Sequence, residues 1–405
     1  MLARGSRSWL VFGFGLALAC QSRPLHVPEA ADAASDNGAG SVPVGPDGGA
    51  GAPACAAGGI AADAGAADAG SSPLAPTCGP ECDRCSNGRC VRVLASSSSP
   101  GPLALTSSEV IWADYAGDQP AAILKVSSNG GMPQTLAVAP AGTTVNSLAI
   151  DSDYAYWTQS SSVPNPYPPM PPPDGAVMKT PIASGASTAV ASGLIDPIWV
   201  AVSEGVVYWS AYDGIWSAPT GGGAPISFAK DTTFRMASAA GRAFWDARDE
   251  TGRGSAIRTR ALVPDAAAVT LVAATENPID TVLGMAASST DLYWAGYIDP
   301  PRSSHGCGVM KISLCGGAPT TIFTGTEDGA DIGVAVDGEN VYWMDEFYDG
   351  LAGREQRRIM KAPVGGGAPT ILVETVGEIW NIVVDDTSVY YTDGFDGTVV
   401  KVTPK

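Results

Sequence analysis

Four cysteines lie within a span of 13 residues, at Cys78, Cys82, Cys85 and Cys90. Their C-x3-C-x2-C-x4-C spacing could supply thiolates to a zinc ion or close two disulfides, because both arrangements bring sulfur atoms together. If the chain is exported, as its N-terminus indicates below, oxidising conditions favour the disulfides. We therefore expect two disulfides, and the spacing leaves all three pairings open.

The other cysteines are Cys20, Cys55, Cys307 and Cys315. Without Cys20, for which a separate role is argued below, seven cysteines remain, so at least one lacks an intrachain partner. Cys55 is our candidate for that residue. Cys307 and Cys315 flank a predicted strand, and if it is straight they lie about 26 Å apart at roughly 3.3 Å per residue, too far for a disulfide.

Catalysis has little support in the sequence. The only histidines are His26 and His305, and no nucleophile elbow, zinc-protease signature or phosphate-binding loop occurs. Paired carboxylates could still act as acid and base on a glycan, with His305 as the first further candidate. A carbohydrate-active lyase or hydrolase is therefore an alternative function, and we expect a protein that binds rather than catalyses.

A binding site is better supported, because aromatic and acidic side chains are interleaved in the segments between predicted strands. Rings stack on sugars, and carboxylates accept hydrogen bonds from hydroxyls or cationic side chains. The carboxylates could also bind Ca²⁺, although no segment matches a D-x-[DN]-x-[DN]-G loop, and we expect no other cofactor. The candidate residues are Tyr115, Tyr212, Tyr297, His305, Asp345, Glu346, Phe347, Tyr348 and Phe395.

These segments belong to a unit that is repeated along the chain. An aromatic pair, or an Ile-Trp equivalent, recurs at intervals of 36 to 52 residues. This period is typical of four-stranded propeller blades, and helical periodicity is absent. Seven pairs predict an all-β, seven-bladed β-propeller of four-stranded antiparallel blades, with the paired rings in the core. The pairs are Ile111-Trp112, Tyr156-Trp157, Tyr208-Trp209, Phe244-Trp245, Tyr293-Trp294, Tyr342-Trp343 and Tyr390-Tyr391.

Each unit is expected to contain four strands in a fixed order. The first is short and apolar, as in 334–336, and the second carries the aromatic pair. The third has an apolar-apolar-Lys pattern such as Ile359-Met360-Lys361, and the fourth begins after a Gly-rich turn that ends in proline, such as Pro369. Proline lacks an N–H group and suits the start of an edge strand, so the fourth strand is predicted to be outermost.

The connections between second and third strands are predicted to be long in four units and to gather on one face. Insertions on one face of a repeat architecture commonly mark its binding face. Without such a site the ring would be a structural scaffold, which is the third function that we consider. The acidic residues just after the aromatic pairs, Asp114, Asp246, Asp345 and Asp393, are interpreted as structural acceptors in turns. The four long connections are 159–175, 246–255, 296–308 and 345–358.

The last unit, 379–405, has only three predicted strands. Residues 90–95 read as the missing fourth strand. Pairing of this N-terminal strand with the C-terminal strand 398–402 would close the ring and remove the exposed edges of an open array. The cysteine-rich segment would then lie beside the closing seam.

Some of the repeats resemble a known family. Tyr390-Tyr391-Thr392-Asp393 and Tyr156-Trp157-Thr158-Gln159 are similar to the YWTD repeats of low-density lipoprotein receptor propellers, and to related bacterial envelope propellers. The resemblance covers about 310 residues and implies a propeller with a binding role. Receptor YWTD domains have six blades, and the seven units counted here depart from that number.

The N-terminus indicates export. Residues 1–19 contain Arg4 and Arg7 and then an apolar run, as in a secretory signal. Cys20 directly after this run resembles the lipidated cysteine of bacterial lipoproteins. Residues 20–77 are rich in Ala, Gly, Pro, Asp and Ser and are predicted to be a disordered tether, followed by the cysteine-rich segment 78–90 and the propeller 91–405.

The formal net charge is −18, which repels nucleic acid and anionic membranes. We therefore expect no nucleic-acid partner and membrane attachment through the lipid anchor alone. The sequence predicts an exported monomer held at the cell envelope, on the outer membrane, with an envelope glycan or protein as its partner.

Overall fold

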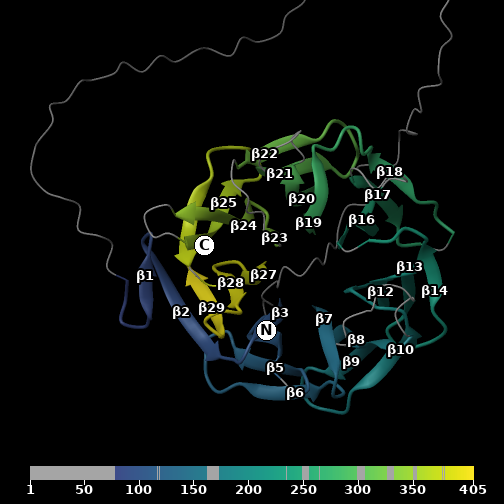
Figure 1. Ribbon diagram of the computed structural model, residues 1–405, viewed down its shortest axis with the longest axis horizontal. Coiled ribbons are helices and arrows are strands. Elements are labelled where there is room, and N and C mark those ends of the chain that lie inside the picture. The colour runs from purple at the N-terminus through teal and green to yellow at the C-terminus, as the bar shows by residue number, and fades with distance from the viewer. Residues whose placement is uncertain are drawn as a thin grey trace, which may run out of the picture. The chain divides into compact units, whose positions relative to one another are not determined.

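The computed structural model shows seven β-sheets arranged in a ring (Figure 1). Six of the sheets contain four strands that pair in chain order, and the seventh contains the last three strands of the chain together with the first two. The predicted all-β, seven-bladed propeller is confirmed. No described segment forms a helix long and apolar enough to cross a membrane. The structure describes residues 78–405 except 116, 118, 162–172, 234, 249–254, 264, 299–305, 326–332, 350–353, 376 and 378.

We number the blades in chain order. Blade 1 contains β3 (Pro100–Leu105), β4 (Glu109–Asp114), β5 (Ala122–Ser127) and β6 (Gln134–Val138). Blade 2 contains β7 (Thr143–Ile150), β8 (Tyr154–Ser161), β9 (Gly175–Pro181) and β10 (Thr188–Leu194). Blade 3 contains β11 (Trp199–Ser203), β12 (Val206–Ala211), β13 (Gly214–Pro219) and β14 (Ile226–Ala229). Blade 4 contains β15 (Met236–Ala239), β16 (Arg242–Arg248), β17 (Ser255–Ala261) and β18 (Val269–Val272).

The remaining blades follow the same order. Blade 5 contains β19 (Ile279–Ala287), β20 (Asp291–Ile298), β21 (Gly306–Ser313) and β22 (Thr320–Thr324). Blade 6 contains β23 (Val334–Val336), β24 (Asn340–Asp349), β25 (Arg354–Pro363) and β26 (Thr370–Thr375). Blade 7 contains β27 (Ile379–Val384), β28 (Val389–Asp393), β29 (Thr398–Thr403), β2 (Arg89–Ser96) and β1 (Arg84–Ser86).

The aromatic pairs form the core between blades, as predicted. Successive strand residues point to opposite faces, so one member of each pair packs on the preceding blade and the other on the following blade. Seven buried clusters result, each joining the first residue of one pair to the second residue of the next pair. They contain Ile111 with Trp157, Tyr156 with Trp209, Tyr208 with Trp245, Phe244 with Trp294, Tyr293 with Trp343, Tyr342 with Tyr391, and Tyr390 with Trp112.

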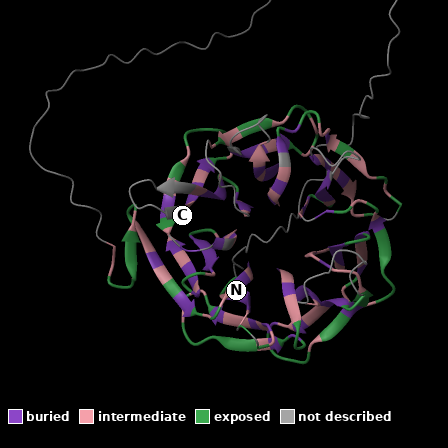
Figure 2. Ribbon diagram, viewed as in Figure 1, coloured by how far each residue is buried: buried purple, intermediate pink, exposed green. Residues whose placement is uncertain are grey.

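The fourth strands form the outer rim, where β6 and β10 expose most of their residues (Figure 2). In blade 6 the turn before the fourth strand contains Gly366 and Gly367, with φ at 93° and 148°. Residues with a Cβ atom rarely adopt these backbone angles, whereas glycine does so readily. Pro369 follows, and β26 begins at the next residue. The glycines make the tight turn and the proline starts the edge strand.

The ring closes between the two ends of the described chain. Strand β2 pairs antiparallel with β29, with Val91 opposite Val402 and Arg92 opposite Lys401. Leu94 of β2 is buried with Trp112 of blade 1. The predicted closure by an N-terminal strand is therefore confirmed, and β2 contributes to the core at the seam.

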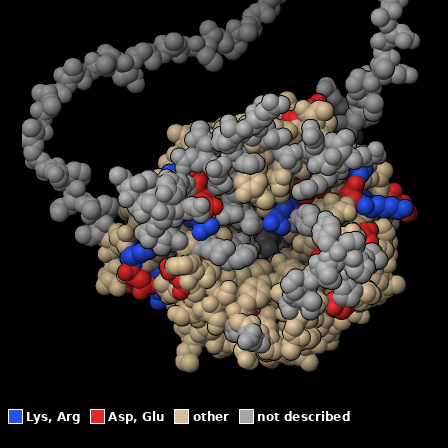
Figure 3. All heavy atoms as spheres, viewed as in Figure 1, with Lys and Arg blue, Asp and Glu red and all other residues tan. Residues whose placement is uncertain are grey.

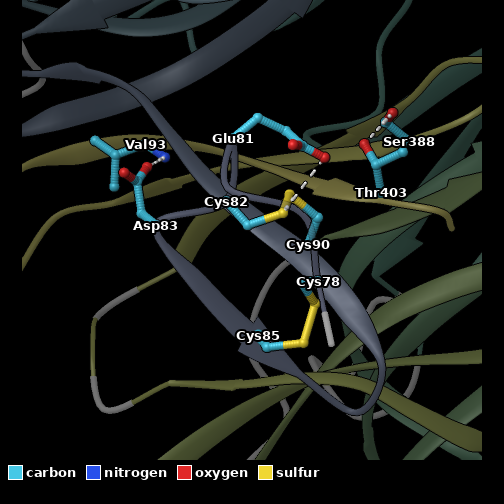
Figure 4. The surroundings of a disulfide bond; sticks show 9 residues. All are labelled: Cys78, Glu81, Cys82, Asp83, Cys85, Cys90, Val93, Ser388 and Thr403. Carbon is cyan, nitrogen blue, oxygen red and sulfur yellow. Dashed lines mark hydrogen bonds between the residues drawn. A yellow bond between two sulfur atoms is a disulfide. The ribbon is translucent and has the colours of Figure 1, made fainter. Parts of the chain in front are cut away.

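The four clustered cysteines form two disulfides, Cys78–Cys85 and Cys82–Cys90 (Figure 4). They hold the β1–β2 hairpin, and the backbone N–H of Val93 donates to Asp83 at 2.6 Å on the same hairpin. The zinc alternative is not supported, because both sulfurs in the one described cluster of possible metal ligands belong to a disulfide.

Cys307 lies on β21 as a buried free thiol, and it does not pair with Cys315. Cys315 is disulfide-bonded, and none of the other described cysteines is its partner. Cys55, our candidate for the unpaired cysteine, lies outside the described residues. Within the described part of the chain, the free thiol is Cys307.

Lysines cross five of the boundaries between neighbouring blades. In blades 1, 2, 5, 6 and 7, a lysine of the third strand donates from Nζ to a backbone carbonyl one or two residues beyond the third strand of the next blade. Lys361 reaches the carbonyl of Lys405 at 3.1 Å, and Lys401 reaches that of Ser128 at 3.3 Å across the closing seam. The others are Lys125 to Ile182, Lys179 to Thr220 and Lys311 to Val364.

Blades 3 and 4 lack this lysine, because Ser217 and Thr259 stand opposite the first residue of their aromatic pairs. Arginines cross the two remaining boundaries. Arg260 of blade 4 donates to the carbonyl of Phe228 in blade 3, and Arg235 Nε donates to that of Leu283 in blade 5 at 2.5 Å. Every boundary in the ring is thus crossed by a cation bound to a carbonyl.

Candidate functional site

The connections between second and third strands lie on one face of the ring, which we call the long-loop face. They are shorter than predicted, because strand pairing continues beyond the ends that the sequence indicated. The predicted segments 159–175, 246–255, 296–308 and 345–358 become 162–174, 249–254, 299–305 and 350–353. The opposite side, which we call the short-turn face, carries the turns between first and second strands and between third and fourth strands.

Blade 6 differs most from the prediction. Strands β24 and β25 stay paired from Asn340 opposite Pro363 to Asp349 opposite Arg354. Two cross-strand ion pairs explain the extension: Arg358 Nη2 lies 2.6 Å from Asp345 Oδ2, and Arg357 Nη2 lies 2.8 Å from Glu346 Oε1. Opposite charges placed across antiparallel strands stabilise pairing by about 0.2–1 kcal/mol.

Asp345 and Glu346, predicted on the binding face, therefore hold the hairpin of blade 6. Asp345 is buried and also accepts a contact from the thiol of Cys307 at 3.6 Å. Burial, reinforced by the carboxylate of Asp345, raises the pKa of Cys307 to about 12. These groups form a structural link between blades 5 and 6.

Two further acidic residues are turn acceptors, as the sequence indicated. Asp114 accepts the backbone N–H groups of Ser98 and Ser99 at 3.0 and 2.9 Å. Asp393 accepts those of Phe395 and Asp396 at 3.1 and 2.9 Å, and burial raises its pKa. Asp114 thus joins the segment before β3 to the end of β4, and Asp393 holds the turn that follows β28.

Asp246 follows the same pattern in blade 4. It accepts the hydroxyl of Thr233 and the backbone N–H of Arg235 at 3.2 Å. Burial raises its pKa, although these hydrogen bonds act in the other direction. The described acidic residues that follow the aromatic pairs are thus engaged within the fold.

The predicted aromatic residues fall into two groups. Tyr212 and Phe395, in the connections of blades 3 and 7, are 53% and 75% exposed. Tyr115 instead packs against the cluster between blades 1 and 2 and donates its hydroxyl to the carbonyl of Val145, and burial raises its pKa. Tyr297 lies half-buried on β20, opposite Cys307.

Three other predicted residues cannot be placed in the site. His305 lies outside the described residues. Phe347 and Tyr348 belong to β24, opposite Gln356 and Glu355, and their side chains are not described. The arrangement therefore brings Tyr212 and Phe395 to the exposed surface of the long-loop face, and no described acid–base pair accompanies them.

A cavity of about 400 Å³ runs along the centre of the ring, where the first strands of all seven blades form its wall. Figure 3 shows a hollow at this position. Most of the described lining side chains are apolar or small, and the aromatic one is Trp199. The charged ones are Asp385 and Asp386, in the turn between β27 and β28.

This cavity was not predicted from the sequence. Short apolar first strands are read as buried core, and nothing in one strand shows that seven of them leave space at the axis. The only signal was the Asp385-Asp386 pair at a turn next to a first strand. Such a pair is ordinary at a turn, so it did not stand out.

Comparisons with known proteins identify the fold of this chain but no family. No protein-family model matches the sequence, and no curated protein matches it. The YWTD likeness therefore remains a resemblance of motifs.

Among solved structures, the chain is similar to YCF48 bound to D1 peptide, with a TM-score of 0.51 and 9% identity over 78% of this chain and 96% of that one. It is similar to the β-propeller domain of the Trilobed protease from Pyrococcus furiosus, described as having an open velcro topology, with a TM-score of 0.51 and 8% identity over 76% and 93%. The extracellular domain of the putative hybrid two-component system BT4673 from B. thetaiotaomicron also matches, with a TM-score of 0.51 and 10% identity over 76% of this chain and 38% of that one. At these identities the likeness supports a seven-bladed β-propeller fold alone.

Proposed function

We propose that this protein is an exported lipoprotein whose propeller binds a protein partner through the long-loop face, without catalysing a reaction. The observation that carries the proposal is the exposure of Tyr212 and Phe395 on that face. Exposed aromatic rings are frequent anchors of protein interfaces, because they bury a large area at a small cost in side-chain entropy.

The hydrogen bonds beside these rings favour a protein over a glycan. Sugar recognition needs free acceptors for hydroxyl groups, whereas Asp393, next to Phe395, is buried and already accepts three hydrogen bonds. Asp114 and Asp246 are engaged in the same way. The exposed rings of Tyr212 and Phe395 are therefore not accompanied by these carboxylates as free acceptors for the hydroxyl groups of a sugar.

The charge of the chain favours a partner with basic side chains. The net charge is −18, and six of the seven lysines donate to backbone carbonyls of the ring. On the face drawn in Figure 3, described charged groups lie at the left and right of the ring and beside the central hollow, and they are sparse over β5 and β6. Complementary charge speeds association and rejects acidic partners.

The proposal is tested with the chain from residue 21 onward, which lacks the anchor. Peptide arrays of graded charge and aromatic content, and envelope polysaccharides with and without Ca²⁺, are offered to the protein, and polysaccharide length is measured. We expect saturable binding of basic peptides, weakened at least about tenfold by Tyr212→Ala with Phe395→Ala, as for hot-spot aromatics. Ile226→Ala on β14, an exposed apolar residue of the outer rim, is the matched control.

The other outcomes separate the alternatives. Binding of a polysaccharide in place of peptides would make the ligand a glycan, and dependence on Ca²⁺ would add a cation to the site. Shortened polysaccharide would show a lyase or hydrolase, with His305 the first residue to replace. If nothing binds, a scaffold role replaces the proposal.

Anchoring is tested separately in cells. Export follows from the signal-like residues 1–19, and attachment to the outer membrane follows from Cys20. We expect Cys20→Ser to move the protein from the membrane fraction to the soluble fraction of the envelope. An unchanged distribution would remove lipidation from the proposal and leave the binding function standing.

A further inference from the structure

We propose that the central cavity binds a small amphiphilic amine: one ammonium group attached to a linear apolar body. The ammonium would lie at the short-turn end, beside Asp386, and the apolar body along the axis. The proposal concerns a second site, distinct from the exposed aromatic residues of the long-loop face.

The size of the cavity fits an elongated small molecule. Its volume is about 400 Å³, and its wall includes residues from Asn381 to Asp386 along one strand and the turn that follows. Five steps of roughly 3.3 Å make this wall about 16 Å long. The wall thus admits an alkyl chain of eight to ten carbons.

Apolar side chains line much of the wall, with Ser147, Ser238 and Asn381 between them. Leu148, Val202, Met285 and Val383 contribute half-buried side chains from four different blades. Methionine and branched aliphatic side chains shed water readily and adapt to an alkyl chain. Most of the affinity for a ligand in this part would come from burial of its hydrocarbon, which grows with chain length.

Charge selects the head group. The described charged residues of the wall, Asp385 and Asp386, are both acidic and lie at the short-turn end. Asp385 is already occupied, because it accepts the hydroxyl of Tyr390 at 2.7 Å and the backbone N–H groups of Thr387 and Ser388 at 2.7 and 2.8 Å. Asp386 is exposed and has no side-chain hydrogen bond to any described residue, so its carboxylate is available to an ammonium group.

The other end of the cavity differs in character. Trp199 pairs with Ser210 at the start of β11, so its ring lies toward the long-loop face. The described residues that line this end include no acidic side chain. A second ammonium group would therefore lose water there without gaining a carboxylate partner, which favours a monoamine over a diamine.

The test uses the unlipidated full chain and calorimetric titration with hexylamine, octylamine, 1,8-diaminooctane, octanoate and octanol. We expect 1:1 binding of octylamine, tighter than hexylamine by about fourfold per methylene. Diaminooctane and octanol should bind more weakly than octylamine, and octanoate should not bind detectably. The graded chain length reports on the apolar wall, and the change of head group reports on Asp386.

Two variants locate the site. Asp386→Asn should weaken octylamine by up to about fivefold, the upper end for an exposed ion pair, and should leave the ratio between octylamine and hexylamine unchanged. Asp153→Asn, an exposed carboxylate in the corresponding turn of blade 2 that does not line the cavity, should have no effect. Ala201→Leu, in the wall, should weaken octylamine more than hexylamine.

The proposal fails if octanoate or octanol binds as tightly as octylamine, or if no amine binds. It fails equally if Asp386→Asn and Asp153→Asn have the same effect. Should Ala201→Leu prevent folding, the comparison between Asp386→Asn and Asp153→Asn still decides, because both side chains lie in exposed turns.

Discussion

Lys361 Nζ donates to the backbone carbonyl of Lys405 at 3.1 Å, and this contact joins blade 6 to blade 7. Lys405 in turn uses its own Nζ to contact Asp337 Oδ2 at 2.6 Å and the carbonyl of Asp385 at 2.5 Å. Lys405 is thus held by residues of blade 6 and of blade 7. The repeated lysine of the third strand is explained by this type of contact, which adds a hydrogen bond between blades to the packing of their aromatic rings.

Replacement of Lys361 by methionine is expected to destabilise the fold by about 1–2 kcal/mol, because it removes a charged donor and leaves a carbonyl without that partner. Methionine keeps most of the apolar stem, so the loss reports on the hydrogen bond. The free energy of unfolding from urea titration measures it. Lys230→Met, at an exposed lysine outside these contacts, should change stability by less than about 0.5 kcal/mol. Equal effects of the two substitutions would contradict the interpretation.

Leu94→Ala is expected to cost about 2–5 kcal/mol, because Leu94 is 3% exposed and packs at the seam between blades 7 and 1. Its neighbour Val93 is 39% exposed, so Val93→Ala on the same strand is the control and should cost far less. Thermal and urea unfolding of both variants measures the difference. If both variants unfold like the parent, β2 is not part of the cooperative unit and the ring does not depend on its closing strand.

Asp337 should contribute to acid sensitivity. Burial alone would raise its pKa, but hydrogen bonds from Lys405, from the backbone of Asn340 and Glu339, and from Tyr342 outweigh it and hold the pKa below the ordinary 3.8. A lowered folded-state pKa contributes stability that is fully present above the unfolded value and is lost as pH falls through the folded value.

The stability difference between the parent and Asp337→Asn should therefore be largest above about pH 5 and should shrink as pH falls below 3.8. Urea titrations between pH 2 and pH 7, read as a difference between the two proteins, measure this. A difference that is constant across that range would show that Asp337 does not titrate differently in the folded and unfolded states.

Cys307 should be unreactive in the folded protein. Its thiol is buried, and with a pKa of about 12 almost none of it is thiolate at pH 8. Labelling by iodoacetamide at pH 8 is expected to require unfolding, so the urea dependence of labelling should follow global unfolding. Cys307→Ser identifies the labelled site. Labelling of native protein at the rate of an exposed thiol would show that blades 5 and 6 separate locally.

Several features of the fold could be predicted from local sequence. The aromatic pairs identify seven units because two adjacent strand residues must face the two neighbouring blades, and both faces are buried. In four blades, paired glycines and then a proline precede the fourth strand, as at Gly366, Gly367 and Pro369, and they specify the turn through backbone geometry alone. The closing strand could be found by counting, since the last unit lacked its fourth strand. These inferences depend on residues that are close in sequence, or on the repeat itself.

The candidate site was predicted less well, and for a physical reason. Asp345 and Glu346 are acidic residues beside aromatic ones, which reads as a binding loop, but Arg358 and Arg357 lie opposite them once the strands pair. Tyr115 reads as a face residue, but the fold directs its hydroxyl to the carbonyl of Val145. Tyr212 and Phe395 differ from these only in lacking such neighbours. Which polar or aromatic side chain stays available depends on partners up to a whole blade away.

The sequence by itself determined the all-β repeat, the number of blades, the closing strand and the negative charge, because each follows from local periodicity or composition. The tertiary structure alone decided which cysteines pair, which carboxylates are occupied and where space remains at the axis. Those properties arise from distances between residues of different blades. In a ring, seven similar units meet through contacts that no single unit contains. The core residues can therefore be predicted from the sequence of one repeat, whereas the residues of a site cannot.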